Sequence, residues 1–101
     1  MGTKMIEGYR VAVTGLGVIS PIGLTAGTFW QSTIQGKNGI APLTGLDPAE
    51  LAVHVAAQLK DFDPNKYMDR KEVRRNDRFC QLAIAAAGEA IAGSKLSSEI
   101  Y

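Results

Sequence analysis

The chain has 101 residues, of which 46% are hydrophobic and 21% are charged, and its formal net charge is +1. This composition is typical of a globular domain and differs from that of disordered or membrane-embedded chains. Because the charge is almost balanced, a global electrostatic attraction to nucleic acid is excluded, and any charged binding surface must be local. The length suffices for one small domain and not for two.

The N-terminus and the cysteine count indicate the cellular setting. Residues 1–8, MGTKMIEG, lack the charged and then apolar layout of a signal peptide, and glycines interrupt the longest apolar run. The single cysteine, Cys80, allows neither an intrachain disulfide nor a zinc site built from thiolates. We therefore expect a cytoplasmic protein with no membrane, metal or cofactor, and we interpret residues 1–8 as a leader or a remnant of expression.

Residues 10–23, RVAVTGLGVISPIG, predict a buried strand that runs into a loop with glycines at its corners. The continuous apolar run at Val11–Val13 is typical of a strand covered on both faces, as in the parallel sheets of α/β proteins. Gly15 and Gly17 lack a Cβ, which allows either a sharp turn or the close approach of another backbone. We expect something to bind or pack tightly at these two positions.

The same stretch allows a second interpretation. A strand followed by Gly-x-Gly and a helix is typical of dinucleotide-binding domains, which would place a pyrophosphate on the loop from Gly15 to Gly23. However, Ser20 stands where the third glycine should be, and the residues from Thr25 to Asn38 include no carboxylate to hold a ribose. Structural use of such glycines is the commoner case, and nucleotide binding stays as an alternative.

A helix is predicted over about residues 25–35. Thr25 or Thr28 can cap its first amide groups, apolar residues recur at helical spacing, and a glycine follows its last turn. Its aromatic pair, Phe29 and Trp30, is expected to anchor a core. An aromatic platform for a ligand is the alternative.

Residues 36–48, GKNGIAPLTGLDP, have the composition of a connector with successive turns. Residues 51–59, LAVHVAAQL, alternate between larger apolar residues and others, which predicts a half-buried strand, although the alanines also allow a short helix. His54 lies on the polar side of this strand. We interpret it as a surface residue without a catalytic role.

Two short helices are predicted next. Pro64 suits the first turn of one, with Asp63 as its cap, and Asp69 can cap the second. If the second helix is continuous, the spacing i, i+3, i+4 and i+7 gathers four cations on one face. These cations are Lys71, Arg74, Arg75 and Arg78. Such a face would suit a partner that carries carboxylates or phosphates, and the alternative is a solvated surface laced by neighbouring acidic residues.

Residues 77–92, DRFCQLAIAAAGEAIA, predict a long helix that is apolar nearly all round and therefore packs on several sides. Gly88 in its interior costs about 1 kcal/mol relative to alanine, so we expect another backbone to pass close to it. Cys80 lies on this helix, and we interpret it as a small buried hydrophobe rather than a nucleophile.

Three stretches in register resemble one enzyme family. They are RVAVTGLGVISPIG at 10–23, TFWQSTIQGKNGI at 28–40 and AAQLKDFDPNKYMDRKEVRRNDRF at 56–79. Together they resemble the N-terminus of the elongating β-ketoacyl-acyl-carrier-protein synthases of type II fatty acid synthesis, and polyketide ketosynthases share the pattern more loosely. The similarity runs from Tyr9 to about Leu96. Because those enzymes are several times longer, residues 9–101 resemble only the N-terminal segment of a ketosynthase domain.

The resemblance implies an α/β fold, the N-terminal portion of a thiolase-like layered sandwich that is incomplete in this chain, from a family whose members are usually dimers. It implies an enzyme similar to 3-oxoacyl-(acyl-carrier-protein) synthase II, an acyltransferase that condenses malonyl-acyl carrier protein with an acyl thioester, with decarboxylation, in fatty acid elongation. The family's nucleophilic cysteine and two histidines match no residue here. We therefore expect no catalytic residue in this chain and no condensing activity from it alone.

The resemblance also assigns a partner to the basic residues. In these enzymes a basic patch meets the acidic recognition helix of acyl carrier protein, and its members fall on Lys71, Arg74 and Arg75, whereas Arg78 has no counterpart. Three alternatives remain: a non-catalytic docking module for acyl carrier protein, a fragment of a polyketide ketosynthase, and a nucleotide-binding domain that uses the Gly15–Gly23 loop. No nucleic acid partner is expected.

Overall fold

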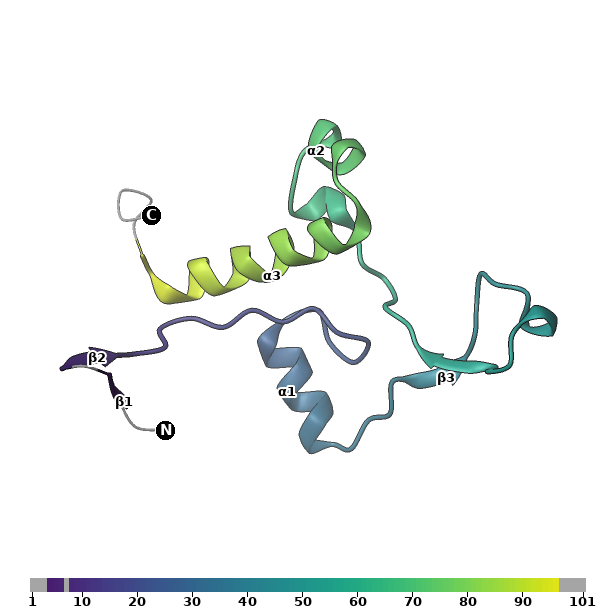
Figure 1. Ribbon diagram of the computed structural model, residues 1–101, viewed down its shortest axis with the longest axis horizontal. Helices are drawn as coiled ribbons and strands as arrows, with labels where there is room; N and C mark the ends of the chain where they lie inside the picture. The colour runs from purple at the N-terminus through teal and green to yellow at the C-terminus, as the bar shows by residue number, and fades with distance from the viewer. Residues whose placement is uncertain (1–3, 7, 97–101) are drawn as a thin grey trace.

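The computed structural model describes residues 4–6 and 8–96. Its elements are short and are joined by long stretches without regular structure (Figure 1). In chain order they are β1 (Lys4–Ile6), β2 (Tyr9–Val11), α1 (Ala26–Ile34), β3 (Ile40–Pro42), the 3₁₀ helix η1 (Pro48–Glu50), β4 (Val55–Ala57), the 3₁₀ helix η2 (Pro64–Lys66), α2 (Arg70–Arg75) and α3 (Arg78–Ser94). Of the predicted leader, residues 1–3 and 7 lie outside the described residues.

The first strand differs from the one that the sequence predicts. β1 and β2 form an antiparallel hairpin in which Met5 lies opposite Arg10. The apolar run at Val11–Val13 is neither buried nor part of a parallel sheet, and the side chain of Val13 is 69% exposed. A strand covered on both faces needs neighbouring strands and helices, and among the described residues β2 has one partner strand of three residues.

α1 begins and ends where predicted, because local contacts define both ends. The hydroxyl of Thr25 accepts a hydrogen bond from the amide of Thr28 at 3.1 Å, and the hydroxyl of Thr28 accepts one from the amide of Thr25 at 3.1 Å, which completes a capping box. Gly36 follows the helix with a φ of +71°. The expected core role of Trp30 is wrong for this chain, since its side chain is 59% exposed, and Phe29 is half-buried.

β3 and β4 form a second antiparallel hairpin, in which Ala41 lies opposite Ala56. β4 confirms a strand rather than a helix within residues 51–59, although it is shorter than predicted. β3 lies inside the stretch 36–48, which the sequence predicts as a connector, because turn-forming residues on both sides conceal a strand of three residues. Figure 1 shows this hairpin at one end of the molecule, apart from α1 and α3.

The segment between β2 and α1 packs along α3, which is the longest element (Figure 1). A Cβ on Gly17 would overlap the carbonyl group of Ala86, and a Cβ on Gly15 would overlap that of Ala90. The two glycines therefore allow the close approach of another backbone, as predicted. The corresponding prediction for Gly88 is wrong, because the space where its Cβ would lie is open.

Glu89 connects α3 to the same segment and to α1. One carboxylate oxygen accepts a hydrogen bond from the amide of Val18 at 2.9 Å, and the other accepts one from the amide of Ala26 at 2.9 Å. Ala26 is the first residue of α1, where amide groups have no partner within the helix and a negative charge is stabilising. A single side chain of α3 thus fixes two other parts of the fold.

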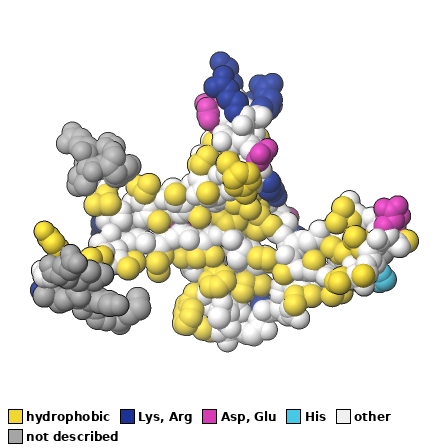
Figure 2. Space-filling view, viewed as in Figure 1, with side chains coloured by type: hydrophobic (Ala, Val, Ile, Leu, Met, Phe, Trp, Pro, Cys, Tyr) yellow, Lys and Arg dark blue, Asp and Glu magenta, His cyan; other side chains and the backbone are white. Residues whose placement is uncertain are grey.

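The described residues enclose very little hydrophobic surface. Phe62 and Ala85 are the buried hydrophobic residues, and Figure 2 shows apolar side chains spread over the visible face. The radius of gyration is 17.4 Å, whereas a compact domain of 100 residues has about 13 Å. The accessible surface is 8077 Å², whereas a compact monomer of this mass exposes roughly 5,500 Å². The fold is therefore open, and its hydrophobic side chains lack a cover.

Candidate functional site

α2 carries the cations that the sequence predicts as a binding surface. Its N-terminus is set by Asp69, whose carboxylate accepts a hydrogen bond from the amide of Glu72 at 2.9 Å. Lys71, Arg74 and Arg75 are exposed on this helix, and the helical spacing i, i+3 and i+4 places them on one side. We call these three residues the basic face. Figure 2 shows Lys and Arg side chains gathered at the tip of the molecule that α2 forms.

Two of the acidic residues next to the basic face, Asp69 and Glu72, are engaged with amide groups. Asp69 caps α2, and the carboxylate of Glu72 accepts a hydrogen bond from the side-chain amide of Asn76 at 3.4 Å. Asp77 precedes α3 without a capping hydrogen bond from its side chain. Lys71, Arg74 and Arg75 are open to solvent, so a solvated helix surface stays an alternative to a binding surface.

Arg78 lies apart from the basic face, so the prediction of four cations on one helix is wrong for this residue. α2 ends at Arg75 and the backbone of Asn76 is extended, which interrupts the helical spacing. Arg78 begins α3, and its guanidinium carbon lies 4.8 Å from the centroid of the Phe62 ring, a cation–π contact. The ring of Tyr67 stacks on Phe62 with 5.4 Å between centroids.

The junction of α2 and α3 depends on a residue that sequence reasoning missed as a site residue. Gln81 is buried, and its side-chain nitrogen donates hydrogen bonds to the carbonyl oxygens of Val73 at 3.0 Å and Asn76 at 3.1 Å. The signal was a glutamine in a helix that is otherwise apolar nearly all round, because a buried amide needs hydrogen-bond partners.

The loop from Gly15 to Gly23 does not fit a nucleotide. Carbonyl groups of α3 fill the space above Gly15 and Gly17, and their oxygens would repel a phosphate. The amide of Ala26, at the start of α1, donates to the carboxylate of Glu89, which occupies the place where a helix N-terminus would bind an anion. The nucleotide interpretation is therefore wrong for this loop.

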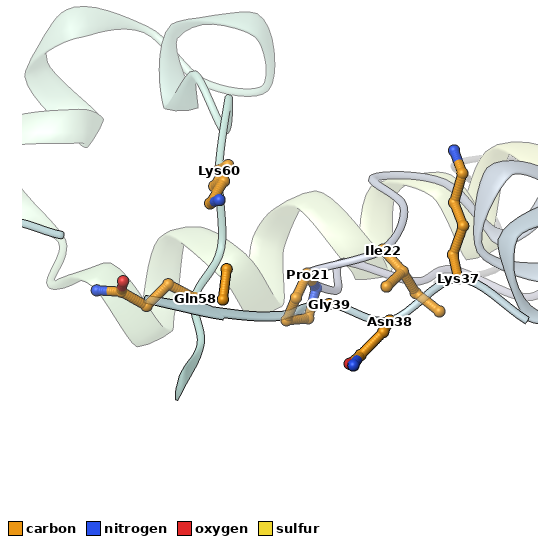
Figure 3. A pocket seen from close by; sticks show the side chains of 8 residues that line it. Pro21, Ile22, Lys37, Asn38, Gly39, Gln58 and Lys60 are labelled. Atoms are coloured by element: carbon orange, nitrogen blue, oxygen red, sulfur yellow. The ribbon is translucent and has the colours of Figure 1, made fainter. Parts of the chain in front are cut away.

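A pocket of about 240 Å³ lies between the turn before α1 and the strands β3 and β4 (Figure 3). Pro21, Ile22 and Gly39 are among the residues that line it. Figure 3 shows the polar side chains of Lys37 and Asn38 pointing in opposite directions. A ligand site needs a few polar groups that converge on one point, and this arrangement does not supply them.

His54 and Cys80, which the sequence leads us to interpret as non-catalytic, lie on separate elements, and Cys80 is less buried than we expect. The ring of His54 is exposed, and its Nε2 lies 3.1 Å from the carbonyl oxygen of Leu51. Cys80 is half-buried on α3, which lies apart from the hairpin that carries His54 (Figure 1). Within residues 4–6 and 8–96, no cluster of His, Cys, Asp or Glu would hold a metal ion, and none of the helices has the length and hydropathy needed to cross a bilayer.

Comparison with known proteins agrees with the resemblance in the sequence. Residues 9–100 match the family model described as the β-ketoacyl synthase N-terminal domain. A 3-oxoacyl-(acyl-carrier-protein) synthase 2 of Synechocystis is 46% identical over 91 residues, which cover 90% of this chain and 22% of the relative. The enzyme of the same name from Staphylococcus aureus is 44% identical over 92 residues, covering 91% of this chain and 22% of the relative. The chain thus spans about a fifth of the length of these relatives.

The fold agrees as well. A solved structure titled "The ishigamide ketosynthase/chain length factor" matches with a TM-score of 0.77 and 29% sequence identity, over 86% of this chain and 22% of the other. The predicted fold class is thereby confirmed: the chain has an α/β fold that forms a portion of the layered, thiolase-like sandwich of ketosynthases. From the family model, the relatives and the fold together, the chain belongs to the β-ketoacyl synthase family and represents its N-terminal domain in part.

Proposed function

We propose that this chain is the N-terminal part of a condensing enzyme similar to 3-oxoacyl-(acyl-carrier-protein) synthase 2. The observation that carries the proposal is the 44–46% identity to enzymes of that name over nine-tenths of the chain. In the reaction, malonyl-acyl carrier protein loses carbon dioxide, and its C2 forms a bond with the carbonyl carbon of an acyl group held as a thioester on cysteine. The enzyme's thiolate leaves, and the acyl chain is two carbons longer.

In this reaction the chain supplies part of the fold and a docking surface, and it supplies no catalytic residue. The cysteine nucleophile and the two histidines that the resemblance implies match no residue here; Cys80 is a free, half-buried cysteine, and the ring of His54 contacts the carbonyl oxygen of Leu51. Its hydrophobic surface is left open, which agrees with a segment that packs against further polypeptide. The isolated chain should therefore not condense malonyl-acyl carrier protein.

The basic face is the proposed docking site for acyl carrier protein. Lys71, Arg74 and Arg75 are exposed on a helix whose own carboxylates are engaged with amide groups. Exposed charges of this kind raise the association rate and set the register of an encounter, while adding little to its lifetime. That balance suits a carrier protein that must leave after each round of elongation.

A chimeric enzyme tests the proposed function. Residues 9–96 of this chain replace the matching segment of the Staphylococcus aureus relative, and condensation of malonyl-acyl carrier protein with an acyl thioester is measured. We expect the chimera to elongate the acyl chain and the isolated 101-residue chain to show no turnover. Turnover by the isolated chain, or a correctly folded chimera without condensing activity while the unmodified relative is active, would contradict the proposal.

Two other functions stay open on specific grounds. The match to a solved ketosynthase/chain length factor supports a polyketide enzyme as an alternative, although its 29% sequence identity to this chain is lower than that of the 3-oxoacyl synthases. A non-catalytic docking module would use the same basic face without any condensation. Carrier protein binding by the chain together with an inactive chimera would favour the docking module. The main proposal also includes assembly as a homodimer and a cytoplasmic location. Size-exclusion chromatography of the chimera tests the homodimer.

A further inference from the structure

The helix that carries the basic face is too short to hold itself in place. α2 has six residues, and isolated helices of fewer than about 12 residues are marginal in water. Its cap at Asp69 satisfies one end, and at the other end the carbonyl oxygen of Glu72 accepts hydrogen bonds from the backbone and side-chain amides of Asn76, so the last turn depends on residues beyond the helix. The direction in which α2 presents its cations must therefore come from contacts with the rest of the fold.

Gln81 supplies those contacts. Its side chain is 8% exposed, and its amide nitrogen donates to the carbonyl oxygen of Val73 at 3.0 Å and to that of Asn76 at 3.1 Å. Val73 lies inside α2, and Asn76 is the residue that follows it. One buried amide in the first turn of α3 thus binds two backbone groups, one inside the basic helix and one just beyond it.

A second contact fixes the base of the same junction. Phe62 is buried beneath the guanidinium group of Arg78 and stacks with Tyr67, which follows η2. This stack joins the segment before α2 to the first residue of α3. The stack thus holds the segment before α2 against the start of α3, and Gln81 connects α2 itself to α3.

We propose that Gln81 is a positioning residue for carrier-protein docking: through Val73 and Asn76 it sets the orientation of α2, and thereby of Lys71, Arg74 and Arg75. This inference rests on the proposed function of the basic face and adds a residue that carries no charge and touches no carrier protein. Because docking by exposed charges depends on their register, a misdirected α2 weakens the encounter without any change in net charge.

The test is Gln81→Met, which keeps the length of the side chain and removes both donors. In the chimera, KM is measured for malonyl-acyl carrier protein and for malonyl-coenzyme A, which carries no carrier protein. We expect KM for the carrier-linked substrate to rise about tenfold, because α2 loses both hydrogen bonds from Gln81 and its cations lose their orientation. kcat and the kinetics with malonyl-coenzyme A should stay unchanged. Gln31→Met, the same substitution at an exposed position of α1, is the matched control.

Hydrogen exchange provides a second measurement on the full 101-residue chain. The amide groups of α2 should exchange faster in Gln81→Met than in the unmodified chain, while those in the second half of α3 stay unchanged. An unchanged ratio of the two KM values, or unchanged exchange in α2, overturns the role of Gln81. If charge reversal at Lys71 and Arg74 also leaves carrier binding unaltered, the docking function itself is wrong; if charge reversal weakens binding and Gln81→Met does not, only the positioning role fails.

Discussion

Gly17 lies so close to α3 that any side chain at this position must push the two backbones apart. A Cβ there would overlap the carbonyl group of Ala86. Gly17→Ala should therefore lower the free energy of unfolding by about 1–3 kcal/mol, the usual cost of overpacking. Gly88→Ala is the control, because that glycine lies in a helix with open space around it, and the substitution should stabilise the helix by about 1 kcal/mol.

Urea unfolding of the 101-residue chain, followed by circular dichroism, measures both effects. Equal midpoints for the two variants would contradict the close packing of Gly17 on α3. The chimera adds a further comparison for Gly88, since destabilisation of the chimera by Gly88→Ala would indicate that polypeptide beyond this chain covers that position.

Glu89 is the second residue on which the arrangement depends. Its carboxylate accepts hydrogen bonds from the amides of Val18 and Ala26. Glu89→Gln replaces one oxygen by a donor that faces an amide N–H, and it removes the charge at the start of α1. We expect a loss of about 1–3 kcal/mol in the free energy of unfolding. Glu50→Gln, at an exposed position in η1, is the control, and a loss of the same size there would show that the effect is not specific to Glu89.

At the scale of elements, we predict that the binding of acyl carrier protein depends on the charge of the basic face of α2. Lys71→Glu combined with Arg74→Glu should weaken binding of acyl carrier protein to the chimera by about tenfold at low ionic strength. Added salt should reduce the difference, because exposed charges are screened over about 10 Å at 0.1 M. Lys95→Glu is the control, since it lies at the far end of α3. Binding is measured by calorimetric titration with acyl carrier protein. If the double variant binds as tightly as the unmodified chimera, the basic face does not take part in docking.

The elements that the sequence predicts correctly are those defined by contacts over a few residues. Thr25, Asp63 and Asp69 each cap the helix that the sequence assigns to them. Each cap is a hydrogen bond between a side chain and an amide two or three residues ahead, so the residue types and their spacing suffice to predict it. The same is true of α3, whose apolar content and length exceed what a strand would have.

The elements that the sequence predicts wrongly depend on partners far away in the sequence, or on a helix end that no glycine or proline marks. The break between α2 and α3 occurs at Asn76, without a glycine or proline to mark it. The pair Asn76–Asp77 was the available signal, since both residue types favour the position before a helix. The prediction of a buried strand at Val11–Val13 failed in this chain because burial comes from neighbours that the sequence of the strand itself does not contain.

At the scale of the whole molecule, the open surface is the feature that needs an explanation. Hydrophobic residues as far apart in sequence as Val13, Trp30 and Phe79 are exposed, and the chain is more extended than a compact domain of its length. When exposed apolar residues form a large contiguous patch, another surface usually covers it. The matched residues cover 22% of the length of the relatives, so we assign the cover to polypeptide of the same kind as the rest of a ketosynthase.

The protection of residues 11–16 against hydrogen exchange tests this account most directly. The measurement compares the isolated 101-residue chain with the chimera, in which the rest of a ketosynthase is present. We predict rapid exchange of these amides in the isolated chain and strong protection in the chimera, where the segment gains neighbouring strands. Equally strong protection in the isolated chain, as a monomer, would show that it encloses its own core, and the central claim would be wrong.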